Sequence, residues 1–233
     1  MKSPHTLRQA SLAFLLAIST NNAAANPPIP SPTGDVHLAS HSGKETAVFA
    51  GGCFWGVQSV FQRVRGVLAT TAGYSGGSAM AATYKQVVTE TTGHAESVEV
   101  IYDPSRITYG QLLRIYFSVA HDPTQLNRQG PDVGRSYRSV IFYTNEEQRR
   151  LSKAYIAQLD AQKVFQKPIV TEVTPLKAFY RAEDYHQDYA YHNPNNCLVH
   201  NPHCGDADTT KNRGRTHVRE LRPSRTVCCS FRW

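Results

Sequence analysis

The sequence lacks any apolar run long enough to cross a membrane. Residues 10–18 are apolar, but this stretch is well short of the roughly 20 residues that a bilayer-spanning helix needs, which argues against a membrane anchor. Lys2 and Arg8 precede it, and Ala23-Ala24-Ala25 follows it as a small-residue cleavage site. We therefore expect residues 1–25 to be a secretory signal cleaved after Ala25. The mature protein should then be soluble and exported, to the periplasm.

Cysteine is scarce and unevenly placed. The chain has five cysteines, and an odd number in an exported protein leaves at least one thiol unpaired. Cys53 stands alone, and the others are Cys197, Cys204, Cys228 and Cys229. A disulfide scaffold would spread its cysteines through the fold, so this pattern favours redox chemistry or a metal site.

The basic charge is also confined to parts of the chain. The formal net charge is +7, but residues 205–233 carry seven Lys or Arg against three Asp or Glu, and residues 1–25 carry two basic residues and no acidic one. Residues 26–204 are therefore almost neutral. We expect no nucleic-acid binding by the folded part, and we interpret the basic end as a solvated extension.

The order of elements along the chain predicts one domain. Residues 26–45 are rich in Pro, Ser, Gly and His and indicate a flexible lead-in, while residues 201–233 lack periodicity and should be an irregular basic tail.

The expected strands are residues 46–50, 67–74, 98–102, 137–143 and 169–173. The expected helices are residues 54–64, a helix capped by Thr108 that passes through Phe117, one from the capping box Thr144-Asn145-Glu146-Glu147 to Gln162, and residues 182–191. Residues 78–96 should be mostly loop. Residues 121–136 should form a polar loop whose length suggests function. Strands alternating with helices predict a two-layer α/β sheet packed by helices.

The most informative segment is Gly52-Cys53-Phe54-Trp55-Gly56. It joins the first expected strand to the first expected helix, so Cys53 should lie at a helix start. Unpaired N–H groups there carry partial positive charge, which stabilises a thiolate and predicts a lowered cysteine pKa. Gly51 and Gly52 permit a tight turn that leaves the sulfur accessible. A thiolate beside two aromatic side chains indicates a nucleophile for a small, partly apolar substrate.

Further motifs extend this pattern into a family resemblance. They are Gly-Cys-Phe-Trp-Gly at 52–56, Gly-Tyr-Ser-Gly-Gly at 73–77, Thr-Tyr at 83–84, Gly-His-Ala-Glu at 93–96, His-Asp-Pro-Thr-Gln at 121–125, Arg-Gln-Gly at 128–130, Tyr-Arg-Ser at 137–139 and Glu-Asp-Tyr-His-Gln-Asp-Tyr at 183–189. In this order, over residues 46–196, the sequence resembles methionine sulfoxide reductase A. The resemblance implies an α+β fold, a mixed sheet with a ferredoxin-like core, and a catalytic domain over residues 46–200. It also implies reduction of the S epimer of methionine sulfoxide, free or in proteins, by a monomer without a bound cofactor.

The matching residues suit that chemistry. A sulfoxide sulfur is electrophilic only when its oxygen is protonated or strongly hydrogen-bonded, so Cys53 would attack while Glu96, kept neutral by an apolar site, acts as the acid. Tyr84 and Tyr137 would donate hydrogen bonds to the oxygen. Phe54 and Trp55 would receive the substrate methyl group, and Asp132 matches a substrate-pocket position of the family. His186 and Tyr189 are interpreted as supporting residues.

The product would be a sulfenic acid on Cys53, which a second thiol must resolve. Cys197 follows Asn193-Pro194-Asn195-Asn196, near the place where many family members carry a resolving cysteine, and Cys204 is the alternative. A thioredoxin-like protein, or dithiothreitol, would then reduce the disulfide. Beyond about residue 197 the sequence departs from the family, and residues 205–233 suggest the hypothesis of a shifted reading frame, which intact mass after export would test.

The sequence is also compatible with three other functions. A zinc-binding module would use the ligand types His192, Cys197, His200, His203 and Cys204, although these lack paired C-x-x-C order. A thiol acyl-transferase or protease would carry an acyl group on Cys53. A purely binding protein held by disulfides would be insensitive to Cys53→Ser. The zinc-binding module leaves residues 52–56 unexplained.

Overall fold

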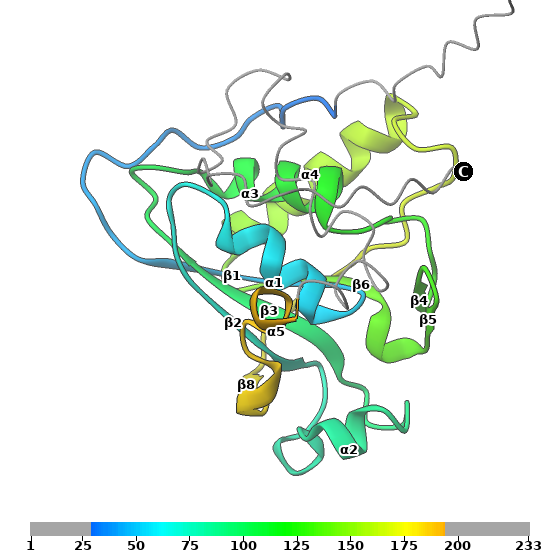
Figure 1. Cartoon of the computed structure of the whole chain (residues 1–233). Helices are drawn as coiled ribbons and strands as arrows, with labels where there is room; N and C mark the ends of the chain where they lie inside the picture. The colour runs from blue at the N-terminus through cyan, green and yellow to red at the C-terminus, as the bar shows by residue number, and fades with distance from the viewer. Residues whose placement is uncertain (1–28, 194–233) are drawn as a thin grey trace, which may run out of the picture.

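The computed structural model describes residues 29–193, and these form a six-stranded mixed sheet with helices packed against it and a separate two-stranded hairpin (Figure 1). The sheet strands are β1 (Glu45–Gly51), β2 (Val67–Ser75), β3 (Ala95–Tyr102), β6 (Ser139–Tyr143), β7 (Glu172–Pro175) and β8 (Phe179–Arg181). The α-helices are α1 (Phe54–Gln62), α2 (Tyr84–Val87), α3 (Tyr109–Ile115), α4 (Glu146–Ala161) and α5 (Tyr189–His192). Shorter elements are the hairpin β4 (Arg128–Gln129) and β5 (Asp132–Val133), the π-turn η2 (Tyr116–Ala120) and the 3₁₀ turns η1 (Ala79–Ala81), η3 (Arg135–Tyr137) and η4 (Asp184–His186). None of the helices between residues 29 and 193 is long and apolar enough to cross a membrane.

The strand order confirms the predicted ferredoxin-like core. The six strands lie in the order β7-β6-β1-β3-β2-β8. The central four, with α1 and α3 between them along the chain, pair antiparallel in the order β6-β1-β3-β2. Strand β7 adds parallel to β6 through the crossover helix α4, and β8 adds antiparallel to β2. The sheet is therefore mixed, as the family resemblance implied.

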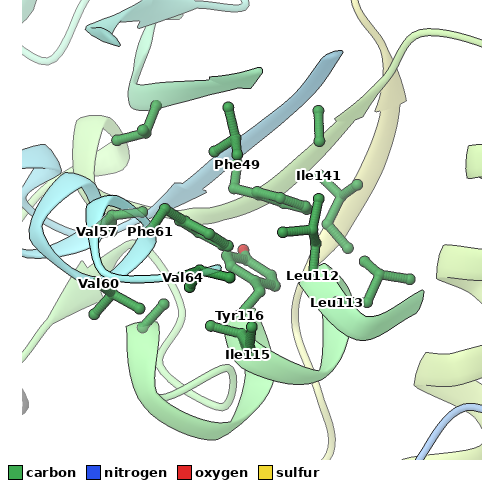
Figure 2. Packing of buried hydrophobic residues seen from close by; sticks show 14 of the residues in the cluster. Phe49, Val57, Val60, Phe61, Val64, Leu112, Leu113, Ile115, Tyr116 and Ile141 are labelled. Atoms are coloured by element: carbon green, nitrogen blue, oxygen red, sulfur yellow. The ribbon is translucent and has the colours of Figure 1, made fainter. Parts of the chain in front are cut away.

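The main core lies between the sheet and the helices α1, α3 and α4. Alternate residues of a strand face opposite sides, so Phe49 of β1 points to the helices. Its ring stacks on Phe61 of α1 at 5.1 Å and on Tyr116 of η2 at 4.9 Å between centroids (Figure 2). Leu112 and Ile141 fill the same layer and are fully buried. Burial of each such side chain contributes on the order of 2 kcal/mol, so this layer fixes the position of α1 on the sheet.

A smaller cluster covers the other face of the sheet. Val48, Ala50 and Phe142 are buried there, and Leu176 and Phe179 pack over them. Strand β1 is consequently buried on both faces, which explains why residues 47–50 form a continuous apolar run rather than an alternating one. The strand that leads to Cys53 is thus enclosed by side chains on both of its faces.

The predicted flexible lead-in is instead bound to the domain over its described part. Residues 29–44 contain no regular helix or strand, as their composition indicated. The Asp35 carboxylate nevertheless accepts hydrogen bonds from Thr108 Oγ1 (2.5 Å) and the Gly110 N–H (3.1 Å) at the start of α3. The Tyr155 hydroxyl of α4 donates to the Pro30 carbonyl at 2.6 Å. Contacts with distant helices, which composition does not encode, hold this segment in place.

Several predicted boundaries were wrong by small amounts. Helix α4 is capped by Asn145 rather than Thr144: the Asn145 side chain accepts from the Gln148 N–H at 2.9 Å, and Asn is at least as good a cap as Thr. The last expected strand begins at Glu172 instead of residue 169. The predicted helix over residues 182–191 divides into η4 and α5, because Asp188 between them adopts φ +54°. Strand β8, just before it, was not predicted.

Candidate active site

Cys53 lies at the junction of a strand and a helix, as predicted. Strand β1 ends at Gly51, and Cys53 is the N-cap of α1. Gly52 adopts φ +87°, which favours glycine, and a Cβ at this position would lie 2.5 Å from the Gln129 side chain. Helix α1 therefore starts directly after a turn that only glycine fits without displacing Gln129.

The environment of the Cys53 thiol differs from the prediction. The side chain is 8 % exposed, and burial raises its pKa well above the ordinary value instead of lowering it. The charge of Glu96 and, to a smaller extent, that of Asp132 raise the pKa further. The backbone N–H groups of Trp55 and Gly56 act in the expected, opposite direction, but they are outweighed. Cys53 is thus a protonated thiol at neutral pH.

Glu96 lies beside Cys53 at the beginning of β3. Its side chain is 3 % exposed, and Oε2 accepts a hydrogen bond of 2.9 Å from the N–H of Phe54. Burial raises its pKa to about 8, an effect that the Phe54 N–H partly offsets and that Asp132 and Glu90 reinforce. A carboxyl with this pKa is mostly protonated at pH 7, which is the state that the sequence prediction required.

Three further predicted residues surround the same centre. Tyr84 begins α2, Asp132 belongs to β5 and Tyr137 ends η3. Burial raises the pKa of both tyrosines, and the charges of Glu96, Cys53 and Asp132 raise it further. Both phenols therefore keep their protons at neutral pH. All three residues are thus close enough to interact electrostatically with the thiol or the carboxyl, although they come from separate segments of the chain.

The two aromatic residues after Cys53 differ in exposure. Phe54 is 1 % exposed, with its ring 4.9 Å from His186 and 5.7 Å from Tyr74 between centroids. The buried Phe54 ring has almost no free surface for the substrate methyl group that it was predicted to receive. Trp55 is half-buried and stacks on Tyr189 at 3.6 Å, with an angle of 12° between the rings. Trp55 is therefore the more accessible of the two predicted apolar contacts.

His186 and Glu183 join the segment that follows β8 to the residues around Cys53. His186 is 1 % exposed, and its Nδ1 accepts from Trp55 Nε1 at 3.1 Å. Burial lowers the pKa of His186, and the nearby Glu183 opposes this shift. The Glu183 carboxylate accepts from the Tyr84 N–H at 2.8 Å and from the Tyr74 hydroxyl at 2.9 Å. The sequence analysis gave Glu183 no role of its own, although it lies inside a quoted motif.

The remaining predicted residues lie outside the described part of the chain. These are the two candidate resolving cysteines, Cys197 and Cys204, and most of the hypothetical zinc ligands. Of that set only His192 is described, at the end of α5. Within residues 29–193 there is no cluster of three or more His, Cys, Asp or Glu side chains that could hold a metal ion. The signal segment also lies outside these residues.

Comparison with known proteins identifies the family to which this sequence is similar. The family model of peptide methionine sulfoxide reductases matches residues 45–217. A peptide methionine sulfoxide reductase MsrA 2 from Mesorhizobium japonicum is 59 % identical over 152 residues, which is 65 % of this chain and 78 % of the relative. A Synechocystis protein with the same name is 53 % identical over 168 residues, 71 % of this chain and 78 % of the relative.

Solved structures give the same result for the fold. Reduced Mxr1 from Saccharomyces cerevisiae is similar with a TM-score of 0.62 at 29 % identity, over 70 % of this chain and 98 % of that chain. Methionine sulfoxide reductase A of Corynebacterium diphtheriae is similar with a TM-score of 0.57 at 33 % identity, over 84 % of this chain and 94 % of that chain. Sequence and fold therefore point to the same group of proteins.

Proposed function

This chain belongs to the peptide methionine sulfoxide reductase family, and we propose that it reduces the S epimer of methionine sulfoxide through a sulfenic acid on Cys53. As a member of this family it is an oxidoreductase, and its reaction is the reduction of methionine sulfoxide. The substrate would be the free amino acid or the residue in a protein. The observation that carries the proposal is a buried carboxyl, Glu96, with a pKa of about 8 and a hydrogen bond to the residue next to the thiol.

Glu96 supplies the proton that the substrate needs. The sulfur of a sulfoxide becomes a good electrophile once its oxygen is protonated, and a carboxylic acid with a pKa near the working pH is an effective donor. Loss of that proton leaves a carboxylate that can take up the proton of the Cys53 thiol. The raised pKa of both groups supports this exchange, because a thiolate and a carboxylate side by side would repel each other.

Tyr84 and Tyr137 stabilise the oxygen as its charge grows. Both keep their O–H groups at neutral pH, because their pKa values are raised. Donors fixed before the reaction stabilise developing charge without reorganisation, and loss of one such donor costs roughly 10²-fold or more in rate. Trp55 contacts the apolar part of the substrate beside the thiol. The buried Phe54 ring helps to exclude water from the site.

The chemical balance of the first step is an oxygen transfer. Cys53 sulfur attacks the sulfoxide sulfur and forms an S–S bond to the substrate. The oxygen, protonated by Glu96, then moves from the substrate sulfur to the Cys53 sulfur as the S–O and S–S bonds break, which leaves methionine and a sulfenic acid on Cys53. The substrate sulfur is reduced by two electrons and the Cys53 sulfur is oxidised by two. A second thiol, Cys197 or Cys204, then attacks Cys53 and releases water with formation of a disulfide. A thioredoxin-like dithiol restores both thiols by exchange.

We also propose a cellular setting for the enzyme, based on the composition of residues 1–25. The cleaved signal at residues 1–25 would deliver the enzyme to the periplasm. There it would act as a monomer, with no bound cofactor, on oxidised methionine in exported proteins. An exported thioredoxin-like protein would serve as its reductant. Cleavage after Ala25, read from the N-terminus of the purified mature protein, tests this part independently of activity.

The experiment that tests the reaction is an assay of the two sulfoxide epimers separately, with dithiothreitol as reductant. We expect turnover of the S epimer only, and none in Cys53→Ser, whose smaller but similarly shaped side chain leaves the fold unchanged in circular dichroism. Equal turnover of both epimers, or activity that survives in Cys53→Ser, would refute the proposal.

A further inference from the structure

We propose that Glu90 is a positioning residue that holds the segment carrying Asp132 and Tyr137 against the reacting centre; this inference rests on the proposed function. The Glu90 carboxylate binds Ser136 twice. Oε2 accepts from the Ser136 N–H at 2.8 Å, and Oε1 accepts from the Ser136 hydroxyl at 2.6 Å. Ser136 is 2 % exposed and directly precedes Tyr137, so this double hydrogen bond fixes the backbone from which Tyr137 extends.

The backbone of Glu90 is held in an unfavourable conformation. Its φ is +62°, in the left-handed region that residues with a side chain adopt at a cost. Such outliers persist where the surrounding structure determines them, and they cluster at functional sites. A glycine would meet the backbone geometry at position 90 without strain, but it would provide no carboxylate for Ser136. The contact with Ser136 is therefore the feature that this strained position makes possible.

The opposite side of the contact is fitted to the carboxylate. Gly134 adopts φ +148°, and a Cβ there would lie 2.3 to 2.5 Å from the carboxylate atoms of Glu90. No other residue fits at position 134 unless Glu90 moves. The Glu90 carboxylate therefore occupies the space that a side chain at position 134 would fill. Position 134 lies two residues after Asp132 and three before Tyr137. This close fit, together with the two hydrogen bonds, sets the position of the segment.

A second tie joins the same two parts of the chain. Arg138 is 6 % exposed, and its guanidinium donates to the carbonyls of His94 (3.2 Å) and Gly93 (3.1 Å). Ser136 and Arg138, on either side of Tyr137, are thus both hydrogen-bonded to residues 90–94, the segment that leads into β3 and Glu96. The hydrogen bonds of Glu90 and Arg138 therefore fix the separation between Glu96 and Tyr137. Displacement of a catalytic group by about 1 Å can cost roughly 10²-fold in rate.

Glu90 also acts on Glu96 through its charge. Its carboxylate is one of the groups that raise the pKa of Glu96. The other titratable groups that face Glu96 are Cys53, Tyr74, Tyr84, Asp132 and Tyr137. Removal of the Glu90 charge lowers the pKa of Glu96, so the fall in rate at alkaline pH moves to lower pH. A residue with a merely structural role would not produce this shift.

Two variants of the full chain separate the tether from the charge. Glu90→Gly removes both and relieves the left-handed backbone, whereas Glu90→Gln removes the charge and keeps an acceptor for the Ser136 N–H. Lys163→Gly is the matched control, because Lys163 has φ +50° and lies exposed after α4, away from the site. Ser136→Ala removes one of the two hydrogen bonds without any change at position 90, and it replaces Glu90→Gly should that variant fail to fold.

The expected result is a fall in kcat of about tenfold in Glu90→Gly, with a smaller change in KM, since the affected donor acts in the transition state. Glu90→Gln should recover most of kcat, and both variants should show the alkaline limb at lower pH. The proposal is overturned if kcat of Glu90→Gly stays within about twofold of Lys163→Gly, or if the limb does not move in either variant.

A titration of the Glu96 carboxyl carbon by nuclear magnetic resonance tests the electrostatic part without turnover. We expect a lower pKa of Glu96 in Glu90→Gln than in the wild-type chain, and an unchanged pKa would contradict that part. If the wild-type chain reduces neither sulfoxide epimer, the proposed function fails, while this titration still decides whether Glu90 acts on Glu96.

Discussion

The Phe54 N–H donates a hydrogen bond of 2.9 Å to Glu96 Oε2, which links the residue after the thiol to the buried carboxyl. This bond joins the start of α1 to the start of β3, two elements separated by 42 positions in the chain. It holds the acid beside the nucleophile without a salt bridge. Because no positive side chain within residues 29–193 is among the main influences on Glu96, burial dominates and the carboxyl stays protonated at neutral pH.

The first prediction concerns the pH dependence of the reaction. Glu96 must be protonated to act as the acid, so the rate of the chemical step should fall as pH rises through about 8. Glu96→Gln should lower this rate by about 10²-fold or more and remove the alkaline fall, because an amide is a far weaker donor that does not titrate. Single-turnover rates between pH 6 and 10 measure both effects. Glu99→Gln, on the opposite face of β3, is the control and should keep the wild-type profile.

The second prediction is that the same substitution stabilises the fold. The native carboxyl titrates at about 8 and the unfolded one near 4.5, so the native state holds an extra proton between these values. The free energy of unfolding therefore falls as pH rises from about 4.5 to about 8. Glu96→Gln removes this dependence and should stabilise the protein by on the order of 3 kcal/mol at pH 7. Denaturant unfolding at pH 5 and pH 8 checks it; equal stability of wild type and variant at pH 8 would contradict the account.

The third prediction separates the two candidate resolving cysteines. Cys197→Ser should complete one turnover and then stop when thioredoxin is the reductant, because the sulfenic acid on Cys53 finds no partner thiol. Dithiothreitol should still support steady turnover by direct attack. Cys204→Ser is the comparison and should keep thioredoxin-dependent turnover. Normal turnover of Cys197→Ser, with loss in Cys204→Ser, would assign the resolving role to Cys204.

The fourth prediction concerns the lead-in. Asp35→Ala should lower the free energy of unfolding by roughly 1 kcal/mol, since its carboxylate accepts from the Gly110 N–H in the first turn of α3 and loss of such a side-chain acceptor costs about that much. The control is Asp184→Ala, because Asp184 is 90 % exposed and its ion pair with Arg181 contributes little. Thermal unfolding measures both variants. An equal effect in the two would show that the lead-in adds nothing through Asp35.

Local patterns were sufficient for much of the fold. Strand β1, helix α1 and the N-cap position of Cys53 follow from the apolar run, the helical spacing and the two glycines between them. Strand β8 could not be predicted, because its three residues form a strand only through pairing with Gly73, Tyr74 and Ser75 of β2. The bound lead-in was missed for the same reason, since Asp35 finds its partners on a helix more than 70 positions away.

The electrostatic properties of the site were also only partly predictable from the sequence. The helix start at Cys53 was visible in the sequence, and its N–H groups do act on the thiol. The direction of the pKa shift was wrong, because burial and the charge of Glu96 depend on tertiary packing and exceed the effect of the helix start. The raised pKa of Glu96 was anticipated from the chemistry that the sulfoxide requires. The contacts of Glu183 and Glu90, which join separate loops, had no local signal.

The measurement that tests the central claim most directly is the fate of the oxygen atom in a single turnover. In a chain whose Cys197, Cys204, Cys228 and Cys229 are replaced by serine, methionine S-sulfoxide labelled with ¹⁸O is added without reductant. One portion of the intact protein is weighed directly to detect the label, and a separate portion is trapped with dimedone, which detects the sulfenic acid but releases its oxygen. The account predicts methionine release together with a labelled sulfenic acid on Cys53. Methionine release with an unmodified Cys53, or an oxygen that comes from water, would contradict it.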